Sequence, residues 1–161
     1  MPDKLSIKKY MAKDLVKLSP DMSILQAIDI LLKNRISGAP VVDSQMNLLG
    51  ILSEKDCLNV IIDSRYYDRP FTREKVGEFM TKQVKTLSDN KSILDAAYEF
   101  SHSTYKRFPV MDGDKIIGQI SRRDVLKAVK DIQPEVKLTP SSWINHAPME
   151  PPSKTGHHEP D

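Results

Sequence analysis

Two segments of the chain place apolar residues at positions i, i+3, i+4 and i+7, the spacing of one face of a helix. These residues are Ile24, Ala27, Ile28 and Leu31 in the first segment and Ile93, Ala96, Ala97 and Phe100 in the second. Ser23 and Ser92 stand just before the two stripes, with Gln26 and Asp95 three residues further on, which is the pattern of a capping box. The pattern predicts two amphipathic helices with capped N-termini.

Short β-prone runs surround each predicted helix. They comprise leading runs at 16–18 and 84–87, second strands at 39–42 and 108–111, and third strands at 48–52 and 116–120. Turn residues separate the second strand from the third, so we expect a hairpin in each set. Because proline has no N–H to donate, Pro40 and Pro109 are expected at the start or edge of a strand. A closing helix is expected to begin at Ser53 and again at Ser121.

The two sets of elements are an internal repeat. Met11-Ala12-Lys13 recurs 69 residues later as Met80-Thr81-Lys82, and the shift becomes 68 after the hairpin turn. We therefore expect an α/β (α+β) fold in which two β-α-β-β-α repeats pack about a pseudo-two-fold axis. The expected boundaries are 8–62 for the first repeat, 63–75 for a connector, 76–133 for the second repeat and 134–161 for a proline-rich, disordered tail.

Composition excludes several classes of function. The 161 residues carry 24 basic and 22 acidic side chains, a net charge of +2, which gives no overall attraction to nucleic acid or membranes. The single cysteine, Cys57, excludes an internal disulfide and is interpreted as a core thiol. No apolar run is typical of a signal peptide or membrane span, so we expect a cytoplasmic protein. No catalytic or metal-binding constellation is found, and we expect neither an enzyme nor a metal site.

A Gly-x-x-Ser-x-x-Asp motif occurs twice, where a third strand passes into a closing helix. Its members are Gly50, Ser53 and Asp56 in the first copy and Gly118, Ser121 and Asp124 in the second. A helix N-terminus favours anions, a serine hydroxyl can donate to a phosphate, and an aspartate can accept both hydroxyls of a ribose. Glycine permits a close approach to the backbone. The alternative is that Ser-x-x-Asp only caps the helix.

The order of these motifs in both halves resembles the cystathionine-β-synthase (CBS) domain family, and the pair resembles a CBS tandem, or Bateman module. The resemblance covers roughly residues 8–130. It implies that the two sheets pack together and that an adenosine-containing ligand, such as AMP, ADP, ATP or S-adenosylmethionine, binds in the clefts between the repeats. The ligand is the expected partner of the fold, and no obligatory cofactor is implied.

The resemblance also assigns roles to residues. It implies that the two motif aspartates bind the ribose and that the two motif serines lie near the phosphate. It also implies that the cations before Pro109 contact the phosphate. Thr86 matches a cleft-lining position of the first strand, where the first repeat has Lys17. The expected nucleotide-binding residues are Gly50, Ser53, Asp56, Thr86, Lys106, Arg107, Gly118, Ser121, Arg122, Arg123 and Asp124.

The two repeats differ in charge at matching places. The second repeat has Lys106-Arg107 and Arg122-Arg123 where the first has Ser37-Gly38 and Glu54-Lys55. Because arginine forks and lysine point charges suit phosphate, the second-repeat elements are better fitted to a charged ligand. The alternative for these cations is a solvated basic surface.

The sequence therefore predicts a stand-alone regulatory sensor that binds an adenine nucleotide and signals to a protein target in trans. The alternative is a ligand-independent interaction or dimerisation module that acts through its helices and the tail around Trp143. A homodimer is expected, because one small sheet cannot bury both apolar stripes. We expect association with neither membranes nor nucleic acid.

Overall fold

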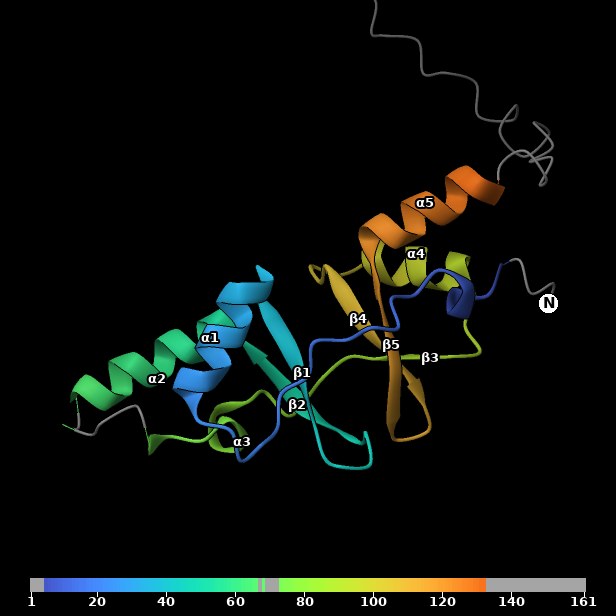
Figure 1. Cartoon of the computed structure of the whole chain (residues 1–161). Coiled ribbons are helices and arrows are strands. Elements are labelled where there is room, and N and C mark those ends of the chain that lie inside the picture. The colour runs from blue at the N-terminus through green and yellow to red at the C-terminus, as the bar shows by residue number, and fades with distance from the viewer. Residues whose placement is uncertain (1–4, 67, 69–72, 133–161) are drawn as a thin grey trace, which may run out of the picture.

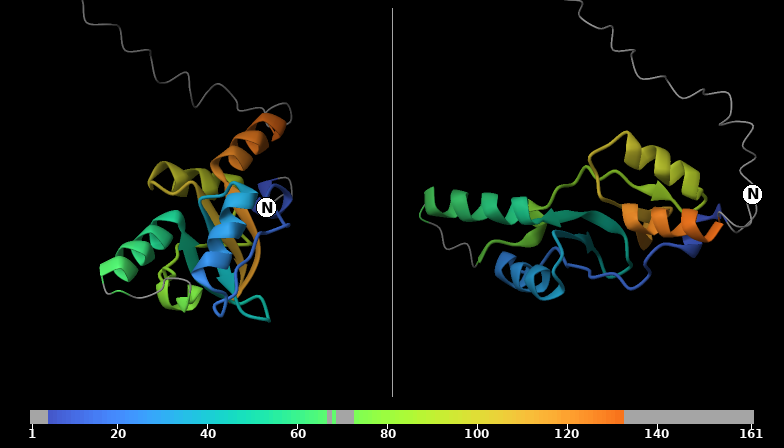
Figure 2. Two further views of the ribbon diagram at one scale, coloured as in Figure 1. Left: turned by 60° about the vertical axis from the view of Figure 1, so that its left-hand side comes forward. Right: turned by 90° about the horizontal axis from the view of Figure 1, so that it is seen from above.

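The computed structural model describes residues 5–66, 68 and 73–132, which form two lobes joined through their strands (Figure 1). The expected tail and part of the connector, residues 67 and 69–72, lie outside the described residues. The elements are η2 (Ile7–Lys9), α1 (Ile24–Asn34), β1 (Gly38–Val42), β2 (Leu48–Ser53), α2 (Glu54–Tyr66), α3 (Val76–Phe79), β3 (Leu87–Ser88), α4 (Ile93–Ser101), β4 (Arg107–Asp112), β5 (Lys115–Ser121) and α5 (Arg122–Ile132). Figure 2 shows α1 and α2 in one lobe and α4 and α5 in the other.

Both predicted stripe helices form, and both predicted capping boxes are confirmed. Ser23 Oγ accepts from the Gln26 amide at 3.2 Å, while Gln26 Oε1 accepts from the Ser23 amide at 3.1 Å. Ser92 and Asp95 repeat this arrangement at the start of α4, at 3.1 and 2.9 Å. Each cap satisfies amides that the first helical turn leaves without partners.

The two predicted hairpins also form, as the antiparallel pairs β1–β2 and β4–β5. Pro40 is the third residue of β1 and lies opposite Ile51. On the other side of β1, the Pro40 carbonyl accepts from the Leu18 amide and the Val42 amide donates to the Leu18 carbonyl, both at 2.9 Å. This pattern uses no amide at residue 40, so the missing proline N–H costs no ladder hydrogen bond.

The predicted leading strands are shorter than expected. In the first repeat only Leu18 pairs, as an isolated parallel bridge to Val41, and in the second repeat β3 comprises only Leu87 and Ser88. The chain upstream of each is paired elsewhere. Ala12 exchanges two backbone hydrogen bonds with Gln119 of β5, at 2.8 and 2.9 Å. A leading segment that pairs with the opposite repeat leaves few residues to pair with its own.

The crossing is mutual, because each leading segment packs into the other repeat. The N-terminal segment with η2 lies beside α4 and α5, whereas α3 lies below α1 and α2 (Figure 1). Ile7 of η2 is fully buried in the core of the second repeat, and Val76 of α3 is fully buried in the core of the first. Each compact unit is therefore assembled from both halves of the sequence, and neither core is complete without the other half.

The tips of the two hairpins join the repeats a second time. The Leu48 amide donates to the Asp114 carbonyl and the Ile116 amide donates to the Met46 carbonyl, both at 3.1 Å. These two bonds are related by the 68-residue shift, so they lie about the pseudo-two-fold axis. Within the described residues, each helix is too short or too polar to cross a lipid bilayer.

We expected a homodimer because one small sheet could not bury both apolar stripes, and this reason is wrong. Ile24, Ala27 and Leu31 are buried in the core of the first repeat, and the matching residues of α4 are buried in the second. The chain buries three of the four residues of each stripe by itself, and Ile28 and Ala97 are partly buried, since η2 and α3 add apolar side chains to the two cores. A different set of large apolar side chains is exposed on the helices: Leu25, Leu32, Leu58, Ile62, Leu94, Tyr98, Leu126 and Val129.

Candidate functional site

A cleft of about 1170 Å³ lies between the two repeats. Its wall includes residues 37–40 and 53–56 of the first repeat and residues 104–107 and 121–123 of the second, together with 83–85 before β3. The N-termini of α2 and α5 are therefore both at the cleft. The positive end of each helix dipole at these starts favours a negatively charged ligand.

The two Ser-x-x-Asp motifs form capping boxes at these helix starts. Ser53 Oγ accepts from the Asp56 amide at 3.1 Å and Asp56 Oδ2 accepts from the Ser53 amide at 2.9 Å. Ser121 and Asp124 make the same pair at 3.2 and 2.9 Å. The capping interpretation is thus confirmed for both motifs. It occupies only one carboxylate oxygen of each aspartate, and Oδ1 is left for another donor.

The two aspartates differ in their surroundings. Asp56 lies on the cleft wall, and its carboxylate accepts from the Thr81 hydroxyl, 3.3 Å from Oδ1 and 3.4 Å from Oδ2. Asp124 is not part of the wall, and its hydrogen bonds among the described residues are those of its capping box. The position equivalent to Thr81 in the first repeat is Ala12, which has no hydroxyl. The Asp56 carboxylate therefore lines the cleft beside a hydroxyl donor, whereas the Asp124 carboxylate does neither.

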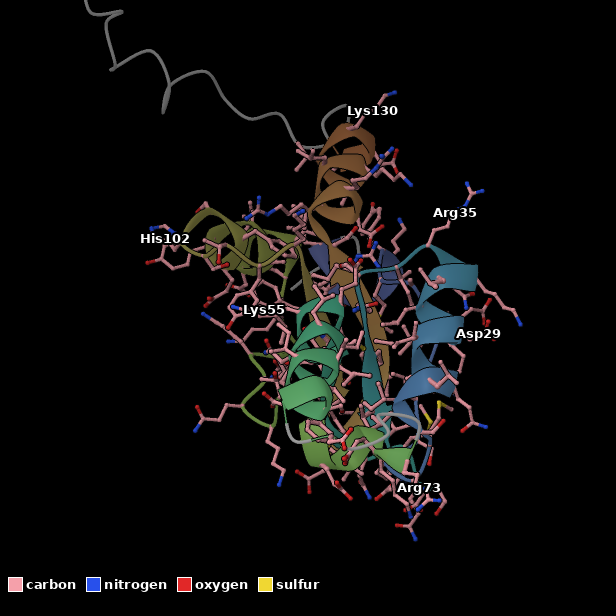
Figure 3. All side chains as sticks on the ribbon, turned by 90° about the vertical axis from the view of Figure 1, so that its left-hand side faces the viewer. Asp29, Arg35, Lys55, Arg73, His102 and Lys130 are labelled. Atoms are coloured by element: carbon pink, nitrogen blue, oxygen red, sulfur yellow. The ribbon has the colours of Figure 1, made fainter. Side chains whose placement is uncertain are left out.

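Positive charge dominates the cleft wall. Seven cationic side chains face only two carboxylates, those of Glu54 and Asp56. The cationic residues are Arg35, Lys55, Lys85, Lys106, Arg107, Arg122 and Arg123. Figure 3 shows Arg35 and Lys55 at the same end of the first repeat, where α1 ends and α2 begins. This charge and the two helix N-termini favour an anionic ligand over a neutral one.

Arg122 has a different role from its neighbours. Its Nε donates to the Tyr105 carbonyl at 2.9 Å and its Nη2 donates to the Ser103 carbonyl at 3.1 Å. The Arg122 amide also donates to the Lys106 carbonyl at 3.2 Å. Arg122 thereby fixes the loop that carries Lys106 and Arg107, and much of its guanidinium is already engaged. Lys106, Arg107 and Arg123 remain exposed at the cleft.

The two motif glycines face the chain's own leading segments and lie away from the cleft wall. A Cβ at Gly50 would lie 2.7 Å from the Thr81 carbonyl oxygen. At Gly118 it would lie 2.5 Å from Met11 Sδ and 3.0 Å from the Ala12 carbonyl oxygen. The close approach that these glycines permit is thus to the crossing backbone.

Thr86 is half-buried and also lies off the wall, whereas Lys85 next to it lines the cleft. The sequence analysis missed Arg35, Lys55, Thr81 and Lys85. Lys55 could have been found from the repeat, because it stands 68 residues before Arg123. The others depend on the crossing segments and on the course of the chain before β3, which local sequence patterns do not encode.

Cys57 follows Asp56 but belongs to the core. It is 4% exposed and packs in the first repeat's core, as interpreted from the sequence. Burial raises the pKa of the thiol, and the Asp56 carboxylate raises it further. The thiol is therefore held in its protonated form. Among the residues that the structure describes, no three histidine, cysteine or carboxylate side chains lie close enough to hold a metal ion.

The repeats that form this cleft are matched by a known family. A family model described as "CBS domain" matches residues 7–63 and, again, residues 76–131. The chain belongs to the CBS domain family. Its mixed helix and strand content and its paired repeats are those of an α+β CBS fold, as predicted. Both CBS repeats contribute to the wall of the cleft.

Known CBS proteins resemble the chain along most of its length. Inosine-5'-monophosphate dehydrogenase of Aquifex aeolicus is 36% identical over 117 residues, 71% of this chain but 22% of that enzyme. The chloroplastic protein CBSX1 of Arabidopsis thaliana is 27% identical over 154 residues, 80% of this chain and 65% of that protein. The chain therefore spans less than two thirds of either relative.

One solved structure is similar to this chain over nearly all of the solved protein's length. The crystal structure of CBSX2, an Arabidopsis thaliana protein, in complex with AMP superposes with a TM-score of 0.69 at 26% identity. The likeness covers 80% of this chain and 98% of that one.

Proposed function

We propose that the chain is a regulatory module that binds an adenosine-containing nucleotide in the cleft between its CBS repeats. One observation carries this proposal: the wall of a single cleft combines the Asp56 carboxylate with Lys106, Arg107 and Arg123 of the other repeat. A nucleotide needs an acceptor for its ribose hydroxyls and cations for its phosphates, and this wall offers both.

The proposed orientation follows from the wall residues. Asp56 accepts from the ribose hydroxyls through Oδ1, which is not used in the capping box and which accepts from Thr81 in the unliganded protein. The phosphates lie towards the start of α5 and the cations of the second repeat, with the Ser121 hydroxyl nearby. Pro40, Ile51 and Val84 provide the apolar wall surface that an adenine ring needs. Because Asp124 lies off this wall, its proposed role with a ribose belongs to a second, separate half-site at the start of α5.

The CBSX2 structure supports the class of ligand, because that protein was crystallised with AMP. AMP is therefore the first ligand to test, followed by ADP, ATP and S-adenosylmethionine. We propose no catalytic step for the chain. The match to inosine-5'-monophosphate dehydrogenase covers only 22% of that enzyme, and binding at the cleft is proposed to alter contacts with a protein target.

We also propose a homodimer, which forms through exposed residues of the helices and not through the apolar stripes. Apolar residues are exposed on both helices of each lobe, for example Leu32 at 72% and Leu126 at 69%. Such residues on four helices also favour a second candidate function, a ligand-independent interaction module. The two functions differ in one respect, since only the first requires the cleft to be occupied.

A thermal-shift series tests the proposed function. The purified chain is melted alone and with AMP, ADP, ATP or S-adenosylmethionine, with inorganic phosphate as the control for simple anion binding. A ligand at 100 times its dissociation constant adds about 2.7 kcal/mol to the free energy of unfolding, which raises the melting temperature clearly. Unchanged melting with every nucleotide, together with retained dimerisation, would favour the interaction module.

A further inference from the structure

One cation of the cleft wall is already paired with a carboxylate outside it. Lys85 lines the cleft, and its Nζ lies 2.5 Å from Oε2 of Glu99 on α4. The two side chains are 44% and 31% exposed, so both remain accessible to water and to other partners. Lys85 can therefore exchange Glu99 for a phosphate oxygen without leaving the cleft.

The first repeat shows that the fold does not need this ion pair. The positions 69 residues earlier are Val16 and Ile30, both of which pack against the first repeat's core. One repeat thus has two apolar side chains packed against its core where the other has an ion pair. The charged version occurs only beside the cationic loop with Lys106 and Arg107, which follows α4 and lines the same cleft.

We propose that Glu99 is a positioning residue that sets the charge preference of the nucleotide site. It neutralises Lys85 in the unliganded cleft, and each additional phosphate of a ligand must compete with the Glu99 carboxylate for this lysine. Glu99 therefore lowers affinity for ligands with long phosphate chains and leaves affinity for the nucleoside unchanged. This inference rests on the proposed function, because it requires a nucleotide in the cleft.

The test compares ATP with adenosine by calorimetry on the full chain. Glu99→Gln frees Lys85 and should raise the affinity for ATP by about two- to fivefold, the range that an exposed ion pair supplies, with no change for adenosine. Glu99→Asp should restore the wild-type ratio of the two affinities. In the Lys85→Met background, Glu99→Gln should no longer raise the affinity for ATP, because its effect acts through the lysine.

The first repeat supplies a matched control. Lys85→Val combined with Glu99→Ile copies its apolar pair, and should fold normally while binding ATP as weakly as Lys85→Met. If the wild type binds ATP but Glu99→Gln changes ATP and adenosine affinity equally, or changes neither, the inference about Glu99 is wrong and the proposed function stands. If the wild type binds neither AMP, ATP nor adenosine, the proposed function fails and this inference fails with it.

Discussion

Thr81 and Asp56 are 25 residues apart in the chain, yet the Thr81 hydroxyl donates to the Asp56 carboxylate at 3.3 Å. Thr81 reaches this place because its backbone exchanges two hydrogen bonds with Ile51, at 2.8 and 2.9 Å. The segment that leads into the second repeat thus forms part of the first repeat's capped helix start. The residue that the 69-residue shift matches to Thr81 is Ala12, so the capped starts of α2 and α5 differ chemically.

Asp56→Asn should weaken nucleotide binding by about 10- to 100-fold, because the charged acceptor for the ribose hydroxyls is lost. Calorimetry with AMP measures this. Asp95→Asn is the matched control, since Asp95 makes the same capping box on α4 and is not part of the cleft wall. Both variants lose a capping carboxylate, but only the first should lose affinity. Equal affinities in the two variants would remove Asp56 from the site.

Asp124→Ala tests the second half-site. We expect it to weaken binding of an adenosine ligand without unfolding the protein, since one capping box contributes only about 0.5–2 kcal/mol. A stoichiometry that falls from two ligands per chain to one would assign Asp124 its own site. An unaltered affinity and stoichiometry would leave it as a helix cap alone.

The elements that depend on local sequence could be predicted. The caps at Ser23 and Ser92 and the two hairpins each follow from a few neighbouring residues, although Pro40 and Pro109 are the third residues of their strands and not the first. The crossing of the leading segments could not be predicted, because the sequence near Ala12 does not determine which sheet edge this segment pairs with. The burial of Ile7 and contacts with a distant part of the chain determine that edge.

The same limit explains what was missed in the site. Ser53, Asp56 and Ser121 were identified as candidates because their motif recurs, and all three line the cleft, whereas Asp124 does not. The motif glycines were assigned to ligand approach, but Thr81 and Met11 fill the space around them. Arg122 was grouped with Arg123 by charge alone. Only the structure shows that its guanidinium is bound to two backbone carbonyls of the neighbouring loop.

Gly50→Ala tests the role of that glycine. An added Cβ would lie 2.7 Å from a backbone oxygen of Thr81, and the backbone cannot yield as a side-chain end would. We expect a loss of roughly 1–3 kcal/mol in the free energy of unfolding, measured by urea denaturation. Nucleotide affinity of the folded protein should change little. The opposite result, full stability with lost affinity, would return Gly50 to the ligand site.

The capping carboxylate of Asp95 on α4 makes the free energy of unfolding depend on pH. Hydrogen bonds from the Ser92 backbone and side chain lower the pKa of Asp95 below its ordinary value of 3.8. A carboxyl group whose pKa is lowered on folding stabilises the folded state fully above its unfolded pKa, and this contribution is lost as the pH falls through the folded value. The stability difference between wild type and Asp95→Asn should therefore be constant near neutral pH and shrink below about pH 3.8. A difference that is the same at both ends of this range would show that the charge of Asp95 is not involved.

The helix faces, finally, predict how two copies meet. Leu126 of α5 is 69% exposed and Leu94 of α4 is 67% exposed, although each is large and apolar. Burying such residues against a second copy removes them from water, at about 25 cal/mol for each Å² of apolar surface. Leu126→Glu should convert a dimer into a monomer in light scattering at micromolar concentration, whereas Lys127→Glu, a charge change at the adjacent exposed position, should not. A wild-type monomer, with and without AMP, would exclude the dimer and leave these faces for a different protein.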